Sequence, residues 1–299
     1  MPFGFSVILI YNIFQKINVS DVDITSQYKR AYNIDTFYLE HNKQLNKDEN
    51  YEKIVERIHL EKYAIDNNIK YNILINSQNE SAILPPDARI LLMKVFDNFE
   101  VLIIFFIIYL SCTIISEEYY SGTIKNILIK PYKRVKILFS KILTDFLIII
   151  LVVLILVTFQ YVLGGLLFGF ESYSLDAIRY NTISQDIETM NLVKYILLLF
   201  TTKMFMYVIL SSFSLLFGII TNNMALNILI SLGAYFLSTF EILKNNITNY
   251  IFIYNWDISK YLFTDSTMLW QSIIISSISL LIFLLLIIII FNKKDVRNI

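Results

Sequence analysis

Apolar runs too long for the core of a soluble domain constrain this chain more than any other feature. The longest extends from Val135 to Phe168, and its charged residues all lie near its start, at Lys136, Lys141 and Asp145. Because a helix rises 1.5 Å per residue, about 20 apolar residues cross the roughly 30 Å hydrocarbon core of a bilayer. With 56% hydrophobic residues and a mean hydropathy of +0.58, the chain is predicted to be an all-α polytopic membrane protein.

Six membrane helices are expected from the apolar pattern. The first, in residues 1–17, contains an apolar run from Pro2 to Phe14 that covers only about 20 Å as a helix. It is either a short anchored helix or the end of a longer one whose beginning was lost to a start codon assigned too late, and we favour the second interpretation. The other five lie in a membrane domain, residues 88–299, at about 88–116, 135–168, 195–220, 223–243 and 269–291.

Residues 18–87 are predicted to form a separate domain between the first two helices, because the composition there turns to Asn, Lys, Glu, Asp and Tyr. Asp48 to Asn67 places apolar residues on a helical period, and Lys70 to Asn76 alternates as a strand does. We therefore expect a small α+β or helical module. His41 and His59 lack a neighbouring cysteine or a metal-binding spacing and are interpreted as solvated side chains.

The distribution of lysine and arginine predicts the orientation. There are six in Glu117–Lys141 and three in Asn292–Ile299, against two in Phe170–Lys194 and two in Lys244–Met268. Basic residues concentrate on the cytoplasmic side, so both termini are expected in the cytoplasm of a cell-membrane protein. The module of residues 18–87 is then extracytoplasmic, as is the polar loop before the fourth helix.

Lys203 is the least expected residue in the membrane helices, since it lies about two turns inside the fourth one. Intramembrane lysines face the bundle interior or a partner carboxylate, or they reach back to the interface. We hypothesise that Lys203 pairs with Glu241, near the same end of the fifth helix, along a substrate path; a lysine that only reaches the interface is the alternative. Asp145 is expected to pair with Lys141, one helical turn away.

The connections around the fifth helix differ in length. Thr221 to Ala225 is long enough only for a tight hairpin between the fourth and fifth helices. Lys244 to Met268 contains several tyrosines and Trp256, which prefer the membrane interface, and is predicted to include a half-inserted or re-entrant segment.

A charged stretch between the second and third helices carries a spaced set of residues. Apolar residues at helical spacing predict a short amphipathic helix from Glu117 to Ile129, ended by a proline. A basic cluster follows and leads into the next apolar run. The set consists of Glu117, Glu118, Gly122, Thr123, Leu128, Pro131, Arg134 and Lys141.

This spacing resembles the signature of permease subunits of ATP-binding-cassette (ABC) exporters, in the type-2 export permease superfamily. The resemblance implies six membrane helices, a partner that is a second copy or a similar permease, and two separate ATPase subunits that bind ATP and Mg. Glu117–Ile129 would be the coupling helix that contacts the ATPases. By the same resemblance Glu118 caps or anchors this helix, Gly122 permits close approach, Pro131 ends the helix, and Arg134 and Lys141 hold the start of the third span at the headgroups.

Several chemistries are missing from the sequence. There is no GxxxxGK[ST] phosphate loop, HExxH or GxSxG motif, so no ATPase, zinc protease or hydrolase activity is expected, and no cofactor in this chain. Equal numbers of acidic and basic residues give no reason to expect a nucleic acid partner, and the single cysteine, Cys112, excludes an intrachain disulfide. The alternatives to an exporter subunit are a membrane sensor or assembly protein and, less favoured, a gradient-driven transporter.

Overall fold

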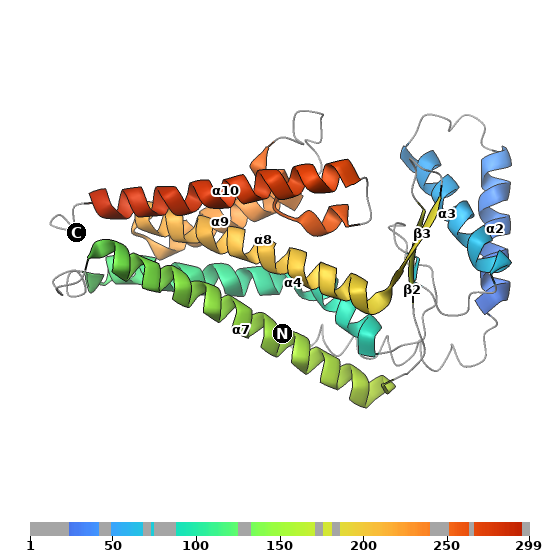
Figure 1. Ribbon diagram of the computed structural model, residues 1–299, viewed down its shortest axis with the longest axis horizontal. Helices are drawn as coiled ribbons and strands as arrows, with labels where there is room; N and C mark the ends of the chain where they lie inside the picture. Colours follow the sequence, from blue (N-terminus) through green and yellow to red (C-terminus); the bar gives the residue numbers. More distant parts are fainter. Residues whose placement is uncertain are drawn as a thin grey trace. The chain divides into compact units, whose positions relative to one another are not determined.

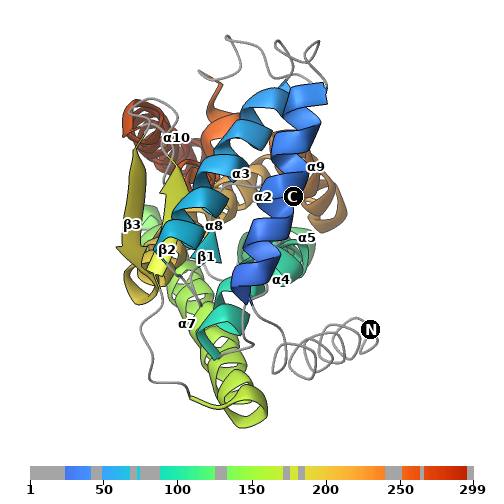
Figure 2. The same ribbon diagram turned by 90° about the vertical axis from the view of Figure 1, so that its right-hand side faces the viewer.

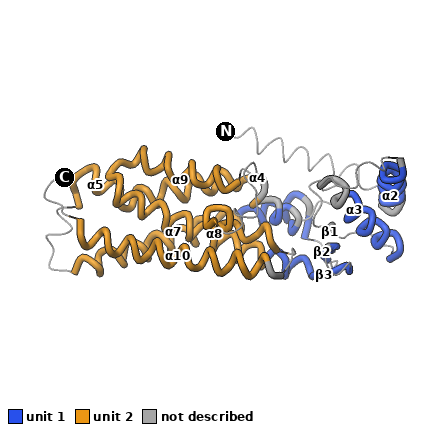
Figure 3. The backbone as a smooth tube through the Cα atoms, turned by 90° about the horizontal axis from the view of Figure 1, so that it is seen from above, with its two compact units in different colours: residues 1–94, 159–197 blue, residues 95–158, 198–299 orange. Residues whose placement is uncertain are grey.

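The computed structural model describes residues 24–41, 49–67, 73–74, 88–124, 133–170, 176–180, 186–239, 251–262 and 266–294. The chain divides into two compact units (Figure 3). Unit 1 consists of residues 1–94 and 159–197, and unit 2 of residues 95–158 and 198–299.

Unit 1 contains a helix pair and a small sheet. Helices α2 (Ile24–His41) and α3 (Glu49–Asp66) lie side by side, with α3 between α2 and the strands (Figures 1 and 2). The sheet has the order β1-β2-β3, with strands Ile73–Leu74, Asp176–Tyr180 and Ile187–Asn191. Strand β1 pairs with β2 in parallel and β3 pairs with β2 antiparallel.

The module predicted within residues 18–87 is therefore α+β but is completed by a distant part of the chain. The predicted helix and strand are both present, although the strand is only two residues long. Strands β2 and β3 lie in the polar loop that precedes the fourth expected helix, where no strand was predicted. The pairing of β1 with β2 joins Ile73 to Ala177, and a pairing between such distant residues leaves no local pattern in the sequence. Leu60, Ile178 and Tyr180 form a shared core, and the exposed His59 ring stacks on Tyr180 at 4.6 Å between ring centroids.

Long helices make up the rest of the described chain. They are α4 (Ala88–Cys112), continued by a π-helical turn (Thr113–Glu117) and α5 (Glu118–Tyr120), then α7 (Arg134–Phe168), α8 (Leu192–Thr221), α9 (Met224–Thr239) and α10 (Ser266–Lys293). Four of these stretches are long and apolar enough to cross a membrane, at Phe99–Tyr120, Arg134–Leu167, Leu192–Thr221 and Met268–Lys293. Helix α9 is apolar but shorter, and the expected first span lies outside the described residues.

Helices α8 and α9 form the predicted tight hairpin. Asn222 has a φ of 53°, in the left-handed region that asparagine tolerates better than most residues. The Asn223 side chain then accepts hydrogen bonds from the backbone N–H groups of Ala225 at 3.0 Å and Leu226 at 3.3 Å. This N-cap fixes the start of α9.

Residues 251–262 turn back into the helix bundle as two short 3-10 helices, Phe252–Asn255 and Ile258–Tyr261. Between them lies the fully buried Trp256, whose ring is 5.3 Å from that of Phe213 on α8. Ser272 and Ser276 of α10 donate hydrogen bonds to the side chain and backbone of Asn255. Residues 251–262 thus pack against α8 and α10, and the half-inserted or re-entrant segment expected in Lys244–Met268 stays a prediction.

Candidate functional site

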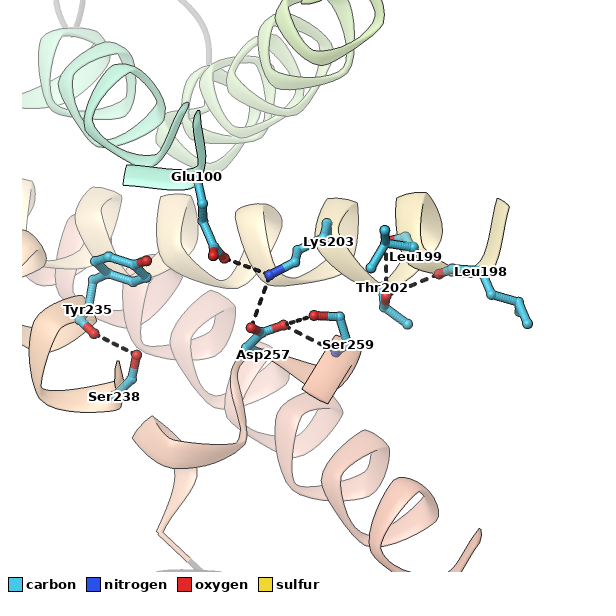
Figure 4. Close-up of polar contacts among 9 residues, drawn as sticks. All are labelled: Glu100, Leu198, Leu199, Thr202, Lys203, Tyr235, Ser238, Asp257 and Ser259. Atoms are coloured by element: carbon cyan, nitrogen blue, oxygen red, sulfur yellow. Dashed lines mark hydrogen bonds and ion pairs between the residues drawn. The ribbon is translucent and has the colours of Figure 1, made fainter. Parts of the chain in front are cut away.

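A buried ion cluster joins three elements of unit 2 around Lys203 of α8. Its ammonium group donates to Oε1 of Glu100 on α4 at 2.6 Å and to Oδ2 of Asp257 at 3.0 Å (Figure 4). The backbone N–H and hydroxyl of Ser259 both donate to the other oxygen of Asp257. The Lys203 side chain is 5% exposed and that of Glu100 is 21% exposed, so the cluster is most open at Glu100.

Among the described residues, Lys203 binds Glu100 and Asp257. The predicted partner Glu241 lies outside the described residues, so the pairing of Lys203 with Glu241 stays a prediction. The alternative, a lysine that reaches the membrane interface, stays a prediction as well. Sequence reasoning missed Asp257 because its position depends on the turn of residues 251–262 back into the bundle.

Two tyrosines interact electrostatically with this Lys203 cluster. Tyr207 follows Lys203 by one turn of α8, is fully buried, and interacts electrostatically with both Glu100 and Asp257. Its hydroxyl has no hydrogen-bond partner among the described residues. Tyr235 of α9 lies on the other side of Glu100 and is coupled to all three charged groups (Figure 4). The arrangement holds a positively charged group between two carboxylates.

A second buried carboxyl group lies on α7. Asp145 is fully buried and accepts a hydrogen bond from Ser111 of α4 at 2.8 Å. Its predicted ion pair with Lys141 is wrong, because Lys141 binds Glu118 instead. Nearby, Cys112 of α4 contacts Ser214 of α8 at 3.1 Å. Small polar side chains thus join α4, α7 and α8, as they do where helices pack closely in membranes.

The π-helical turn that continues α4 meets α8 and α9 at Gly218. Asn227 of α9 donates to the hydroxyl of Ser116 at 3.0 Å. A Cβ atom on Gly218 would lie 2.7 Å from that hydroxyl and 3.1 Å from the amide nitrogen of Asn227. Only glycine fits here without displacing the two side chains.

Glu117, Glu118, Gly122 and Thr123 of the spaced set lie in an elbow of the chain, residues 117–124, at the end of α5. Lys141 of α7 pairs with Glu118 at 2.5 Å and donates to the backbone carbonyl of Ile114 at 3.0 Å. Gly122 has a φ of 71°, and no atom lies within 4 Å of where its Cβ would be. Gly122 therefore forms the left-handed turn that ends the helix, and its predicted role in the close approach of an ATPase subunit stays a prediction.

The predicted single helix from Glu117 to Ile129 is consequently wrong. Glu117 and Glu118 belong to the helical stretch that continues from α4, and the chain turns at Ser121–Thr123. Leu128 and Pro131 lie outside the described residues. Periodicity carried the predicted helix through Gly122 because the apolar spacing continues on both sides of it.

Arg134 ties the start of α7 to the end of α10. Its guanidinium donates to the backbone carbonyls of Asn292 at 3.4 Å and Lys294 at 3.1 Å. Lys294 in turn donates to the carbonyl of Ile219 and the side chain of Asn222, and lies 4.3 Å from the ring centroid of Tyr119. Cations at helix C-termini are favourable, so these contacts hold the ends of four helices together.

A titratable cluster of unit 1 lies between α2 and α3. Arg57 pairs with both oxygens of Asp35, and Glu61 is buried beside them. Burial, and next the negative charge of Asp35, raise the pKa of Glu61 to about 7, while Arg57 opposes the shift. Within the described ranges, no group of three or more His, Cys, Asp or Glu side chains could hold a metal ion.

Comparison with known proteins covers the helical part of the chain. Residues 80–297 match the family described as "Protein of unknown function (DUF2705)". The chain belongs to this DUF2705 family. The match includes the Lys203 cluster and the elbow, whereas α2, α3 and β1 precede it.

A relative of this DUF2705 protein is the uncharacterized protein YhcI of Bacillus subtilis (strain 168). It is 25% identical over 211 residues, which cover 67% of each chain. No solved structure matches the chain.

Proposed function

We propose that this DUF2705 protein is the membrane-spanning permease subunit of an ABC exporter in the cell membrane. The proposed subunit has six spans, with α9 and a helix in residues 1–17 added to the four long apolar helices. It assembles with a second copy or a similar permease and with two ATPase subunits that bind ATP and Mg. Both termini and the elbow lie in the cytoplasm, and the α2–α3 module lies outside.

The exposed turn of the elbow carries this proposal. Tyr120 is 79% exposed at the end of α5, and its neighbours Glu117, Ser121 and Thr123 are exposed as well. A large aromatic side chain on a protruding turn is a typical anchor for a protein partner. The turn lies between two spanning helices, where the resemblance to ABC permeases puts the contact with the ATPases.

The ion pair behind the turn would transmit movement into the membrane helices. Lys141 joins Glu118 and the carbonyl of Ile114 to α7, so a push on Tyr120 acts on α4 and α7 together. The π-helical turn Thr113–Glu117 is a break in regular α-helical hydrogen bonding where α4 can bend. Closure of the ATPases would thereby tilt α4 and α7 and change access to the bundle interior.

Co-purification tests the proposal. The tagged full chain is expressed with each ABC ATPase that its source genome encodes near it, and captured ATPase is compared between the native chain, Tyr120→Ala and Tyr109→Ala. Tyr109 is a matched control, because it lies on α4 and is 42% exposed away from the turn. Loss of an aromatic anchor costs about 2 kcal/mol or more, so capture by Tyr120→Ala should fall roughly thirtyfold at equal expression.

Two results would count against the exporter. If the native chain captures no ATPase, the α2–α3 module becomes the part to study, as a candidate ligand sensor. If Tyr120→Ala and Tyr109→Ala capture as much as the native chain, the turn is not the contact surface.

A further inference from the structure

The Lys203 cluster is built as an ammonium-binding site that the chain's own lysine fills. The ammonium group of Lys203 has three N–H groups. One of them donates to Glu100 and another to Asp257. The two carboxylates come from different elements and converge on a single point (Figure 4). Two carboxylates that accept from two sides favour a ligand group with a positive charge and at least two N–H donors.

One helical turn after Lys203 on α8, the buried hydroxyl of Tyr207 has no hydrogen-bond partner within the described part of the chain. Tyr207 is fully buried, acts electrostatically on Glu100 and Asp257, and has no hydrogen-bond partner for its hydroxyl among the described residues. Buried polar groups are nearly always hydrogen-bonded, so such a group points to a ligand or to another arrangement of the cluster. A hydroxyl oxygen can accept the third N–H of a primary ammonium group.

The lysine itself is suited to leave the site. Its ammonium group sits on a flexible four-carbon stem, whereas Asp257 is held by two hydrogen bonds from Ser259. Asn255, two residues before Asp257, is bound to Ser272 and Ser276 of α10. Asp257 is therefore held in place, whereas the lysine stem is the flexible part of the cluster.

We propose that Glu100 and Asp257 recognise the primary ammonium group of a transported molecule, and that Lys203 occupies this site with its own ammonium group when no ligand is bound. As a statement about the substrate class, this rests on the proposed export function. The binding step itself needs no ATPase, so it can be tested on the purified chain.

Tryptophan fluorescence provides a local readout. The chain has two tryptophans, and Trp256 is adjacent to Asp257. In a Trp270→Phe background, Trp256 is the only tryptophan left to report. The probe is n-hexylammonium, with hexyltrimethylammonium as a cation that has no N–H donor and 1-hexanol as an uncharged molecule with the same chain.

The proposal predicts opposite effects of two substitutions. Lys203→Met removes the internal competitor and should tighten hexylammonium binding about tenfold, whereas Asp257→Asn should weaken it at least tenfold. Lys194→Met, the same change on an exposed lysine of α8, should have no effect. Hexyltrimethylammonium and hexanol should produce no saturable change. Lys203→Gln provides a second neutral replacement should Lys203→Met fail to fold.

Three outcomes would overturn the inference. The first is that neither the native chain nor the Lys203 variant gives a saturable signal with hexylammonium, and the second is that hexanol gives the same response. The third is that the Lys203 and Asp257 changes weaken binding equally, which would show that the cluster is only structural. If the chain captures the ATPase but does not bind hexylammonium, the ammonium site is refuted and the exporter proposal stands. Saturable hexylammonium binding with the predicted variant pattern, but without capture, supports the site and refutes the exporter.

Discussion

Replacing Lys203 by methionine removes the ammonium group that two buried carboxylates share. Methionine keeps most of the length of the stem, so the change tests charge more than packing. Breaking a buried ion pair by removing one partner costs about 3–5 kcal/mol, because a charge is left in an apolar setting. Here water can reach Glu100, whose side chain is 21% exposed, so we expect the lower part of that range, about 3–4 kcal/mol.

Cys112 allows the loss to be measured without an added probe. It is the only cysteine of the chain and is buried against Ser214, so a thiol reagent labels it only when the bundle opens. Where opening and closing are fast, the labelling rate follows the opening equilibrium, and each 1.4 kcal/mol is a factor of ten. Lys203→Met should therefore be labelled several hundredfold faster than the native chain, about 140- to 700-fold.

A double variant separates charge from packing. Asp257→Asn together with Lys203→Met removes one of the two stranded carboxylates, so labelling should be several-fold slower than in Lys203→Met alone. Lys194→Met serves as the control and should label at the native rate. If Lys203→Met changes the labelling rate by less than about tenfold, the ammonium group is not enclosed by these carboxylates and the reasoning is refuted.

Two further predictions concern other parts of the chain. Because the pKa of Glu61 rises from 4.5 to about 7 on folding, its contribution to stability is fully present below pH 4.5 and is lost as the pH rises through 7. Hydrogen exchange of α2 and α3 in the full chain should show protection that falls by about 1–3 kcal/mol over that pH interval. Glu61→Gln should remove most of this pH dependence. An equal slope in the native chain and in Glu61→Gln would contradict the prediction. Gly218→Ala should cost about 1–3 kcal/mol by Cys112 labelling, since its Cβ meets Ser116, and Ser116→Ala should restore most of the loss.

The positions of the long helices could be predicted closely from the sequence. The third span was expected at 135–168 and α7 extends from Arg134 to Phe168; the fourth was expected at 195–220 and α8 extends from Leu192 to Thr221. A helix satisfies its own backbone hydrogen bonds, so its extent follows from the local run of apolar residues. The hairpin at Asn222 was predicted for the same reason, since a short connection leaves few alternatives.

The elbow was predicted in part. The charged stretch between two apolar runs correctly located a turn, but periodicity extended one helix across Gly122. The left-handed φ of that glycine and its exposed neighbour Tyr120 decide the shape of the turn. The spacing of residues does not show whether a single aromatic side chain is exposed, so Tyr120 was not among the expected site residues.

The sequence by itself determined that the chain is a helical membrane protein and where its long helices lie, because both depend on hydrophobicity along a local stretch. It left open whether Lys203 has an anionic partner. Only the tertiary structure decided that the partners are Glu100 and Asp257, 103 and 54 residues away. It likewise decided that β1 pairs with β2, a segment that reads as a loop. Ion pairs and strand pairs form between segments that the tertiary packing brings together. That packing depends on many contacts between distant residues, so it cannot be deduced from any single stretch of the sequence.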